Sequence, residues 1–367
     1  IKAAMLPVGF WLPKTYAVAT TPVAAIFTIM TKVGIYAILR VNGTVFDDEL
    51  SRSILQNLLL PIGLITSVYG AICAVGAERL RRFVGFMILS SIGTILIAIS
   101  LFNTQAWAAA LYYLVHSTLI AAAFYLLSGW ITSQRGEFKD HFKIAPQIKQ
   151  HKVVSITYFI IALMMAGLPP FSGFFGKVFL LQATAQSPYQ LVIIITVLVV
   201  SLLSIIAFTR VGFILFWRST KPEVDPKKPE YAKYQALPEI APKRNDHAIY
   251  ILLSALVLYV VFANPIYQYI SNTATQIQNN ALYEATFLKK DEHGEFISVQ
   301  PFDAKNLPET KYGGETVDPN AHLIPYVISK ETLNGEHISE YKKRQILEQD
   351  IQEDHPEIDQ LKPAEEP

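Results

Sequence analysis

Seven long apolar runs separated by polar connections set the pattern of this chain. They lie at about residues 18–40, 54–77, 83–102, 105–131, 153–182, 189–217 and 246–270. Each holds roughly the 20 apolar residues that a helix needs to cross a bilayer. Because runs of this length suit helices and no alternating ten-residue pattern recurs, we expect an all-α integral membrane protein. Residues 1–12 would be the rear half of an eighth helix.

The run at 153–182 is interrupted in its middle by the sequence AGLPPFSGFFGK, residues 166–177. Pro169 and Pro170 remove two backbone donors and disfavour regular helix just before them, so this run predicts a broken helix. At membrane depth, freed carbonyls are tolerated only inside protein or along a water-filled cavity, and transporters bind ions at such breaks. Pro13 and Pro22 predict a second interruption near the start of the chain.

The composition agrees with a membrane protein. Of 367 residues, 51% are hydrophobic and 17% charged, and the mean hydropathy is +0.31, which is too apolar for an ordinary soluble protein. Cys73 is the only cysteine and lies in an apolar run. Disulfides, thiolate zinc sites and iron–sulfur clusters are therefore excluded within the chain. The chain also offers no flavin or haem ligands, and we expect no cofactor.

The small net charge hides two unlike parts. Residues 1–270 hold 22 Lys and Arg against 11 Asp and Glu, whereas residues 271–367 hold 9 against 19. We therefore expect a basic transmembrane domain at 1–275, followed at 276–367 by an acidic, mostly disordered tail. The chain starts with Ile1 and shows no signal-peptide pattern. We interpret it as a fragment that begins inside a helix.

Basic residues gather in alternate connections, at 78–82, 132–152 and 218–245. The intervening connections hold one arginine between them. The positive-inside bias places the basic connections in the cytoplasm and the acidic tail on the outer side of a plasma membrane. The arginines of ERLRR (78–82) are topology signals, so no nucleic-acid partner is expected.

Four ionisable residues lie within apolar sequence: Lys2, Lys32, His116 and Lys177. A charge at the bilayer centre costs on the order of 2.5–3.5 kcal/mol, so several together suggest a shared purpose. A desolvated lysine can exchange protons near neutral pH, as histidine does without help. Carriers spaced across the midplane with water between them would form a proton relay. Taken singly, each has a plainer explanation, since Lys32 could pair structurally and His116 could hydrogen-bond a neighbouring helix.

Three stretches resemble the antiporter-like membrane subunits of Mrp-type cation/proton antiporters and of respiratory complex I. They are KAAMLPVGFWLPKTYAVATTPVAAIFTIMTKVGIYAILR (2–40), HSTLIAAAFYLLSG (116–129) and AGLPPFSGFFGKVFLL (166–181), and the resemblance covers about residues 1–275. Within the family, the segments around Lys32 and His116 look most like the D-type subunit of the Mrp antiporters.

The resemblance implies a 14-helix fold built from two inverted repeats, each with one broken helix. This chain would supply about seven and a half of those helices. Lys2 and Lys177 would match the lysines of the two broken helices, Lys32 the lysine of the next helix, and His116 a histidine on the hydrated path. The family's front half is missing, and with it the glutamate that pairs with the lysine at position 2. Ile120 stands where some complex I subunits carry a further lysine.

The leading hypothesis is a secondary-transporter subunit, not an enzyme, that moves protons in exchange for Na⁺, K⁺ or Li⁺ within a hetero-oligomer of membrane subunits. One alternative is a proton-pumping subunit of an NADH–quinone oxidoreductase. The other is a scaffold whose lysines serve packing only.

Overall fold

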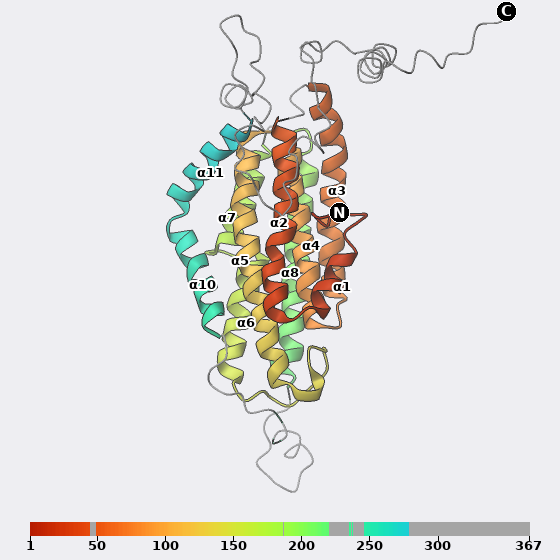
Figure 1. The fold of residues 1–367 in the computed structure, drawn as a ribbon, viewed down its shortest axis with the longest axis vertical. Helices are drawn as coiled ribbons and strands as arrows, with labels where there is room; N and C mark the ends of the chain where they lie inside the picture. Colours follow the sequence, from red (N-terminus) through yellow and green to blue (C-terminus); the bar gives the residue numbers. More distant parts are fainter. Residues whose placement is uncertain (45–48, 186, 220–234, 236, 238–245, 279–367) are drawn as a thin grey trace, which may run out of the picture. The chain divides into compact units, whose positions relative to one another are not determined.

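A computed structural model describes residues 1–44, 49–185, 187–219, 235, 237 and 246–278. The expected acidic tail and most of the connection 218–245 lie outside these residues. The described part is all-helical and holds no β-strand, which confirms the predicted fold class. Its helices are α1 (Trp11–Val18), α2 (Thr21–Thr44), α3 (Glu49–Val75), α4 (Leu80–Ser100), α5 (Thr104–Gln134), α6 (His151–Ala166), α7 (Ser172–Ala183), α8 (Gln190–Gly212), α10 (Asp246–Val261) and α11 (Ala263–Gln278) (Figure 1). A 3-10 turn (Gly136–Phe138) follows α5 and a π-helical turn (Phe213–Trp217) ends α8.

Five helices of the described part are long and apolar enough to cross a membrane on their own. Their spans are Thr21–Gly43, Arg52–Val75, Leu80–Ser100, Thr104–Gln134 and Gln190–Trp217. They correspond to five of the seven predicted runs. The other two runs are each divided into a pair of helices, α6 with α7 and α10 with α11.

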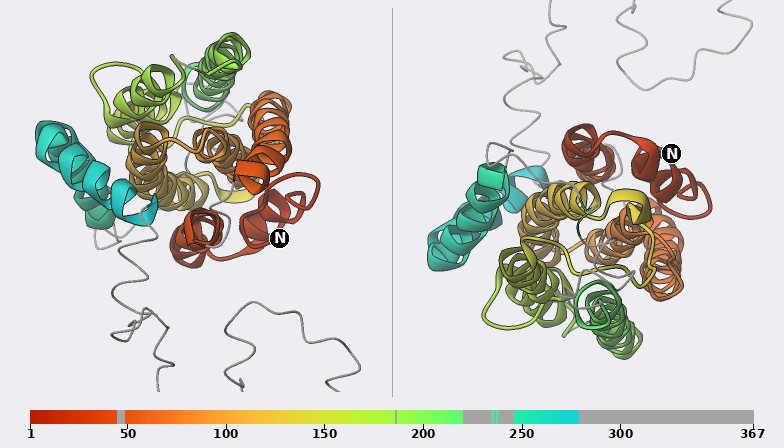
Figure 2. Two further views of the ribbon diagram at one scale, coloured as in Figure 1. Left: turned by 90° about the horizontal axis from the view of Figure 1, so that it is seen from above. Right: turned by 90° about the horizontal axis from the view of Figure 1, so that it is seen from below.

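Helix α4 forms the centre of the bundle, and 94% of its span is buried. It packs against α1, α3, α5 and α8. Figure 2 shows this arrangement end-on, with α10 and α11 at the periphery. Because α4 is enclosed by protein rather than lipid, its serine and threonine side chains can face a cavity without contacting hydrocarbon.

The predicted break around Pro169–Pro170 is present. Helix α6 ends at Ala166, and Gly167 follows in the left-handed conformation, with φ +79°. The next amide, that of Leu168, donates back to the carbonyl of Leu163 at 3.1 Å, which closes the helix end in the way typical of a glycine C-cap. The two prolines then separate this end from α7, which starts at Ser172.

The span predicted at 246–270 is sharply bent, which hydropathy did not predict. Helix α10 ends at Val261, and α11 leaves it at an angle of 82°. Two features at the start of α11 explain the break. Pro265 lies in its first turn, where a missing amide costs nothing, and Tyr267 stacks on Phe179 of α7 with ring centroids 4.3 Å apart. Packing against α7 thus redirects a segment that hydropathy alone reads as straight.

Two of the basic connections, at 78–82 and 132–152, meet at one end of the bundle. Arg79 and His141 form an isolated backbone bridge, and Arg79 Nε lies 3.8 Å from an Asp140 carboxylate oxygen. Arg135 donates to three carbonyls of the connection after α5, those of Lys139, His141 and Lys143. Burial lowers the pKa of the Arg135 guanidinium to about 10, and the Asp140 carboxylate acts in the opposite direction. Arg135 therefore stays charged at neutral pH.

Candidate functional site

Lys177 lies at the helix break, with its ammonium group turned inward. The residue is only 8% exposed. Its Nζ donates to the carbonyl of Ala166, the last residue of α6, at 2.7 Å and to Ser201 Oγ of α8 at 2.9 Å. The C-terminal end of a helix carries partial negative charge and favours a cation. The break therefore leaves the Ala166 carbonyl without a partner within the helix and free to accept from Lys177.

Gly167 makes room for this arrangement. A Cβ added there would lie 2.9 Å from Lys177 Nζ and 3.0 Å from its Cε. The positive φ of Gly167 is also a conformation that other residues rarely adopt. The glycine thus serves the turn and the close approach of the lysine at once.

His116 reaches the same region from the middle of α5. It is 1% exposed, and its Nδ1 lies 2.8 Å from Ser172 Oγ, the first side chain of α7. A Cβ added at Gly173 would lie 2.8 Å from His116 Nε2, so only glycine lets α7 approach this closely. One ring nitrogen is therefore held by the start of α7.

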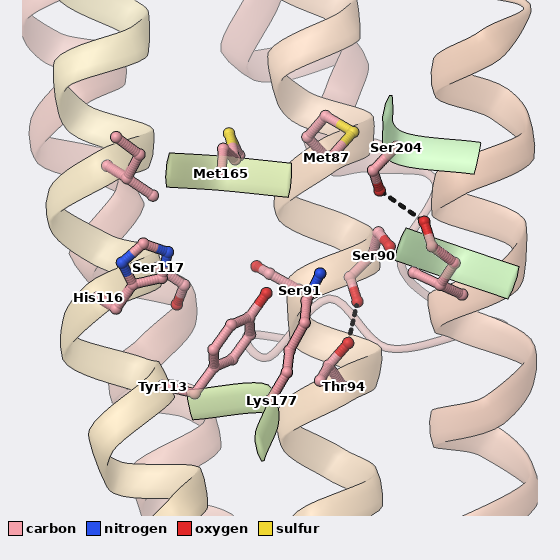
Figure 3. Close-up of a pocket in the computed structure, with 12 residues that line it drawn as sticks. Met87, Ser90, Ser91, Thr94, Tyr113, His116, Ser117, Met165, Lys177 and Ser204 are labelled. Atoms are coloured by element: carbon pink, nitrogen blue, oxygen red, sulfur yellow. Dashed lines mark hydrogen bonds between the residues drawn. The ribbon is translucent and has the colours of Figure 1, made fainter. Parts of the chain in front are cut away.

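A small cavity joins Lys177 to His116 (Figure 3). Lys177, Tyr113 and His116 point into it from α7 and α5, and Met87 and Met165 lie along one side. The remaining hydroxyl groups of its wall are those of Ser90, Ser91, Thr94, Ser117 and Ser204. The cavity has a volume of about 10 Å³, which is room for about one water molecule. The hydroxyl groups that line the cavity can form hydrogen bonds with such a water molecule.

Lys32 is the second buried amine. It lies in the middle of α2, is 3% exposed, and its Nζ has no hydrogen-bond partner among the residues that the structure describes. Helix α2 packs on α5, where Thr28 Oγ1 lies 3.4 Å from the carbonyl of Thr118. Lys32 is not among the side chains that line the cavity shared by Lys177 and His116. An ammonium group buried without a partner is costly.

Lys2 is not brought into this group, because its side chain is exposed. Its backbone packs on α2, where a Cβ added at Gly34 would lie 2.9 Å from the carbonyl carbon of Lys2. Pro13 and Pro22 each stand in the first turn of a helix, α1 and α2, and the chain is non-helical between them at Ala19 and Thr20. The described structure thus joins His116 and Lys177 through one cavity, buries Lys32 on the neighbouring helix α2, and leaves Lys2 exposed.

Sequence reasoning missed the hydroxyl groups of the site. Ser201 and Ser204 lie one turn apart on α8, and Ser90, Ser91 and Thr94 share a face of α4. A signal was available, because polar residues spaced three or four apart within a strongly apolar helix mark a face that meets protein or water. As for metal binding, the described residues contain no group of three or more His, Cys, Asp or Glu side chains that could hold an ion.

Comparisons with known proteins identify relatives of this chain. A family model described as NADH:quinone oxidoreductase/Mrp antiporter, TM, matches residues 1–204. A probable K(+)/H(+) antiporter subunit of the D type, from Rhizobium meliloti, is 31% identical, over 76% of this chain and 54% of that protein. The corresponding Na(+)/H(+) antiporter subunit of Alkalihalophilus pseudofirmus is 28% identical, over 79% of this chain and 56% of that protein. The chain thus spans about half the length of the curated relatives it matches.

Solved structures resemble this fold over a similar share. A chain of the Mrp complex from Dietzia sp. DQ12-45-1b is 25% identical with a TM-score of 0.64, covering 77% of this chain and 58% of that one. A chain of respiratory complex I from Thermus thermophilus is 21% identical with a TM-score of 0.59, covering 76% and 56%. The second likeness concerns the fold alone.

Proposed function

Because the chain belongs to the family of transmembrane subunits described as NADH:quinone oxidoreductase/Mrp antiporter, we propose that it is part of the D-type subunit of a multisubunit monovalent cation/proton antiporter. Its own contribution is to conduct protons through buried lysine and histidine side chains. It is a secondary-transporter subunit and not an enzyme.

The observation that carries this proposal is the setting of Lys177. Its ammonium group is buried at a helix break, hydrogen-bonded to the freed Ala166 carbonyl, and shares a water-sized cavity with His116. A purely structural lysine would gain more from a carboxylate partner or from the membrane surface. A carbonyl and a hydroxyl accept hydrogen bonds from the amine and hold it in place. Neither carries a full negative charge, so the lysine can still give up its proton.

A proton step between the two groups balances as follows. The Lys177 ammonium gives one proton to a water in the cavity and becomes a neutral amine. That water passes a proton to the free ring nitrogen of His116, which becomes an imidazolium. Lys32, a buried amine on the neighbouring helix α2, is proposed as a further group of the same relay. Lys2 would act as the switch that responds to an acidic partner from the rest of the subunit.

We further propose the ion, the partners and the location. The exchanged cation is Na⁺ or a similar monovalent ion, since relatives are named for K(+) and for Na(+) exchange. The partners are other membrane subunits of the same complex. The location is the plasma membrane, with the basic connections in the cytoplasm and the acidic tail outside. Gln278, the last described residue, accepts from Thr104 Oγ1 at the end opposite the basic connections, which supports this orientation.

The test uses the full subunit in its complex, assayed in everted membrane vesicles. Lys177→Ala is expected to abolish cation-dependent proton movement, by at least tenfold, while the amount of assembled complex stays unchanged. Lys152→Ala is the matched control, because Lys152 is an exposed lysine at the other end of the same broken span. Exchange at the wild-type rate in the Lys177 variant would refute the role given to this residue.

The same vesicles separate the antiporter from a redox-driven pump. Proton movement that starts on addition of Na⁺ or K⁺ alone, without a redox substrate, is the expected result. Proton movement that requires NADH oxidation would favour a subunit of the complex I type instead.

A further inference from the structure

The outward face of α11 carries a row of carboxamide side chains. The four residues recur at intervals of four along the helix, and all are exposed: Asn264, Gln268, Asn272 and Gln276. This spacing places them one above the other on one face. The buried residues of the helix, Ile270, Ala274 and Ile277, lie on the opposite face, against the bundle. We refer to the four residues as the carboxamide row.

The row lies at membrane depth. Near the start of α11, Tyr267 stacks on Phe179, two residues from the buried Lys177. At the far end, Gln278 meets Thr104, where α5 begins. Helix α11 therefore runs from the level of the candidate site to one end of the bundle.

The lengths of the two helices agree with this depth. Helices α10 and α11 have 16 residues each, or about 24 Å apiece at a rise of about 1.5 Å per residue. Either helix alone is shorter than the hydrocarbon core of about 30 Å. The two helices are bent by 82° relative to each other, and Figure 1 shows both slanted relative to the long axis of the bundle. Either helix alone therefore covers less than its own length along that axis.

The outward faces of α8 and α10 are largely apolar. Helix α8 exposes Leu191, Leu198 and Leu202, and α10 exposes Ile251 and Val261. These are the side chains expected beside lipid tails. Figure 1 shows α11 following α10 end to end along the edge of the bundle, so the change from an apolar to a polar outward face occurs at the bend between them.

Polar groups that face lipid tails have no hydrogen-bond partner, and within membranes such groups join helices to one another. We propose that the carboxamide row is the docking surface for a transmembrane helix of a neighbouring subunit, which presents Ser, Thr, Asn or Gln side chains to it. Helix α11 contains no charged residue, so the fitting partner is polar and uncharged. This proposal rests on the proposed function, which makes the chain one subunit among several.

The first test replaces polar groups by apolar ones. Gln268→Leu with Asn272→Leu makes α11 better suited to lipid, so poor membrane insertion of the subunit cannot explain a loss of assembly. With the tagged subunit expressed together with its complex, we expect at least tenfold less of the other membrane subunits to co-purify, at an unchanged level of the tagged subunit. Gln182→Leu, at an exposed carboxamide on α7, is the matched control and should assemble normally.

Co-purification at the wild-type level in the double variant would overturn the docking surface while leaving the proposed function intact. If the wild-type subunit itself brings down no other membrane subunit, the proposed function fails as well.

A second test places a thiol by Gln268→Cys in a Cys73→Ser background. We expect the assembled complex to protect it from a membrane-impermeant maleimide. Labelling in the assembled complex would show that the row faces water and would overturn the proposal.

Discussion

Ser201 is the residue whose role is least visible in the sequence. Its hydroxyl donates to the carbonyl of Val197 four residues earlier at 2.7 Å and accepts from Lys177 Nζ. Thr196, on the same helix, donates in the same way to Val192 at 2.8 Å. The contact with Lys177 is what distinguishes Ser201, and it makes this serine a positioning residue for the amine.

Removing that hydroxyl is expected to loosen Lys177 without unfolding α8. A hydrogen bond to a charged group contributes about 1.5 kcal/mol, which corresponds to roughly a tenfold lower transport rate for Ser201→Ala. Ser201→Thr keeps the hydroxyl and should restore most of the rate, and Thr196→Ala should leave it unchanged. Proton movement in everted vesicles measures all three. Equal rates for Ser201→Ala and Thr196→Ala would show that Ser201 does not position the lysine.

Gly167 gives a prediction for stability. Gly167→Ala combines a positive φ with a close contact to the Lys177 side chain, and the φ alone costs about 1–2 kcal/mol. The thermal midpoint of the purified subunit should fall, and transport should fall with it. At Gly76 the nearest atoms to an added Cβ are 3.9 Å away, so Gly76→Ala should be harmless. Similar midpoints for the two variants would contradict the role assigned to Gly167.

At the scale of helices, arginines from neighbouring elements hold helix ends in place. Arg210 Nη1 of α8 donates to the carbonyls of Val75 at 2.7 Å and Ala77 at 3.0 Å, just where α3 ends. Arg81 Nη1 does the same for α1, donating to the carbonyl of Ala19 at 3.1 Å. Since the last carbonyls of a helix lack partners within it, these contacts fix both the end of the helix and its position against its neighbour.

Arg210→Ala should therefore weaken the packing of α8 on α3. It leaves two carbonyls of the α3 terminus without their donor, at a cost of about 1–3 kcal/mol. A lower thermal midpoint of the detergent-purified subunit is the expected result. Arg218, an exposed arginine just beyond α8, supplies the control, because Arg218→Ala should leave the midpoint where it was. Unchanged stability in the Arg210 variant would mean that water replaces the arginine at this helix end.

At the scale of the whole molecule, the two ends of the described bundle differ in charge. The connections that carry Arg79, Arg135 and Asp140 meet at one end. At the other end, Asn103 Nδ2 donates to the carbonyl of Ala183 at 3.2 Å, joining two connections with little charge. The two basic connections that the structure describes, at 78–82 and 132–152, thus share one side of the fold.

The orientation in the membrane can be measured with introduced thiols. In a Cys73→Ser background, Glu137→Cys lies at the basic end and Ala185→Cys at the opposite end, and both native side chains are exposed. The positive-inside bias predicts that an impermeant maleimide labels the first from the cytoplasmic face, in everted vesicles, and the second only in right-side-out vesicles or cells. The reverse pattern would invert the orientation, and with it the predicted outer location of the tail.

Much of the fold followed from hydropathy and from the prolines. Five predicted runs became single helices, the break at Pro169–Pro170 appeared between α6 and α7, and the match to the antiporter family confirms the resemblance read from three stretches. The bend between α10 and α11 was missed. Hydropathy measures only the average affinity of a segment for lipid. The bend involves a contact between distant parts of the chain, the stacking of Tyr267 on Phe179 of α7.

The sequence by itself determined that the chain crosses a membrane as helices, and that Lys32, His116 and Lys177 lie where charge is expensive. Chain length, apolar content and proline chemistry are local properties, so they can be read from residue order. The tertiary structure decided which of these groups meet. It placed Lys177 on a carbonyl of α6 and on Ser201, 24 residues away, joined it to His116 through one cavity, and turned the carboxamide row of α11 outward. Those relations depend on distances between helices, and the order of residues does not specify such distances.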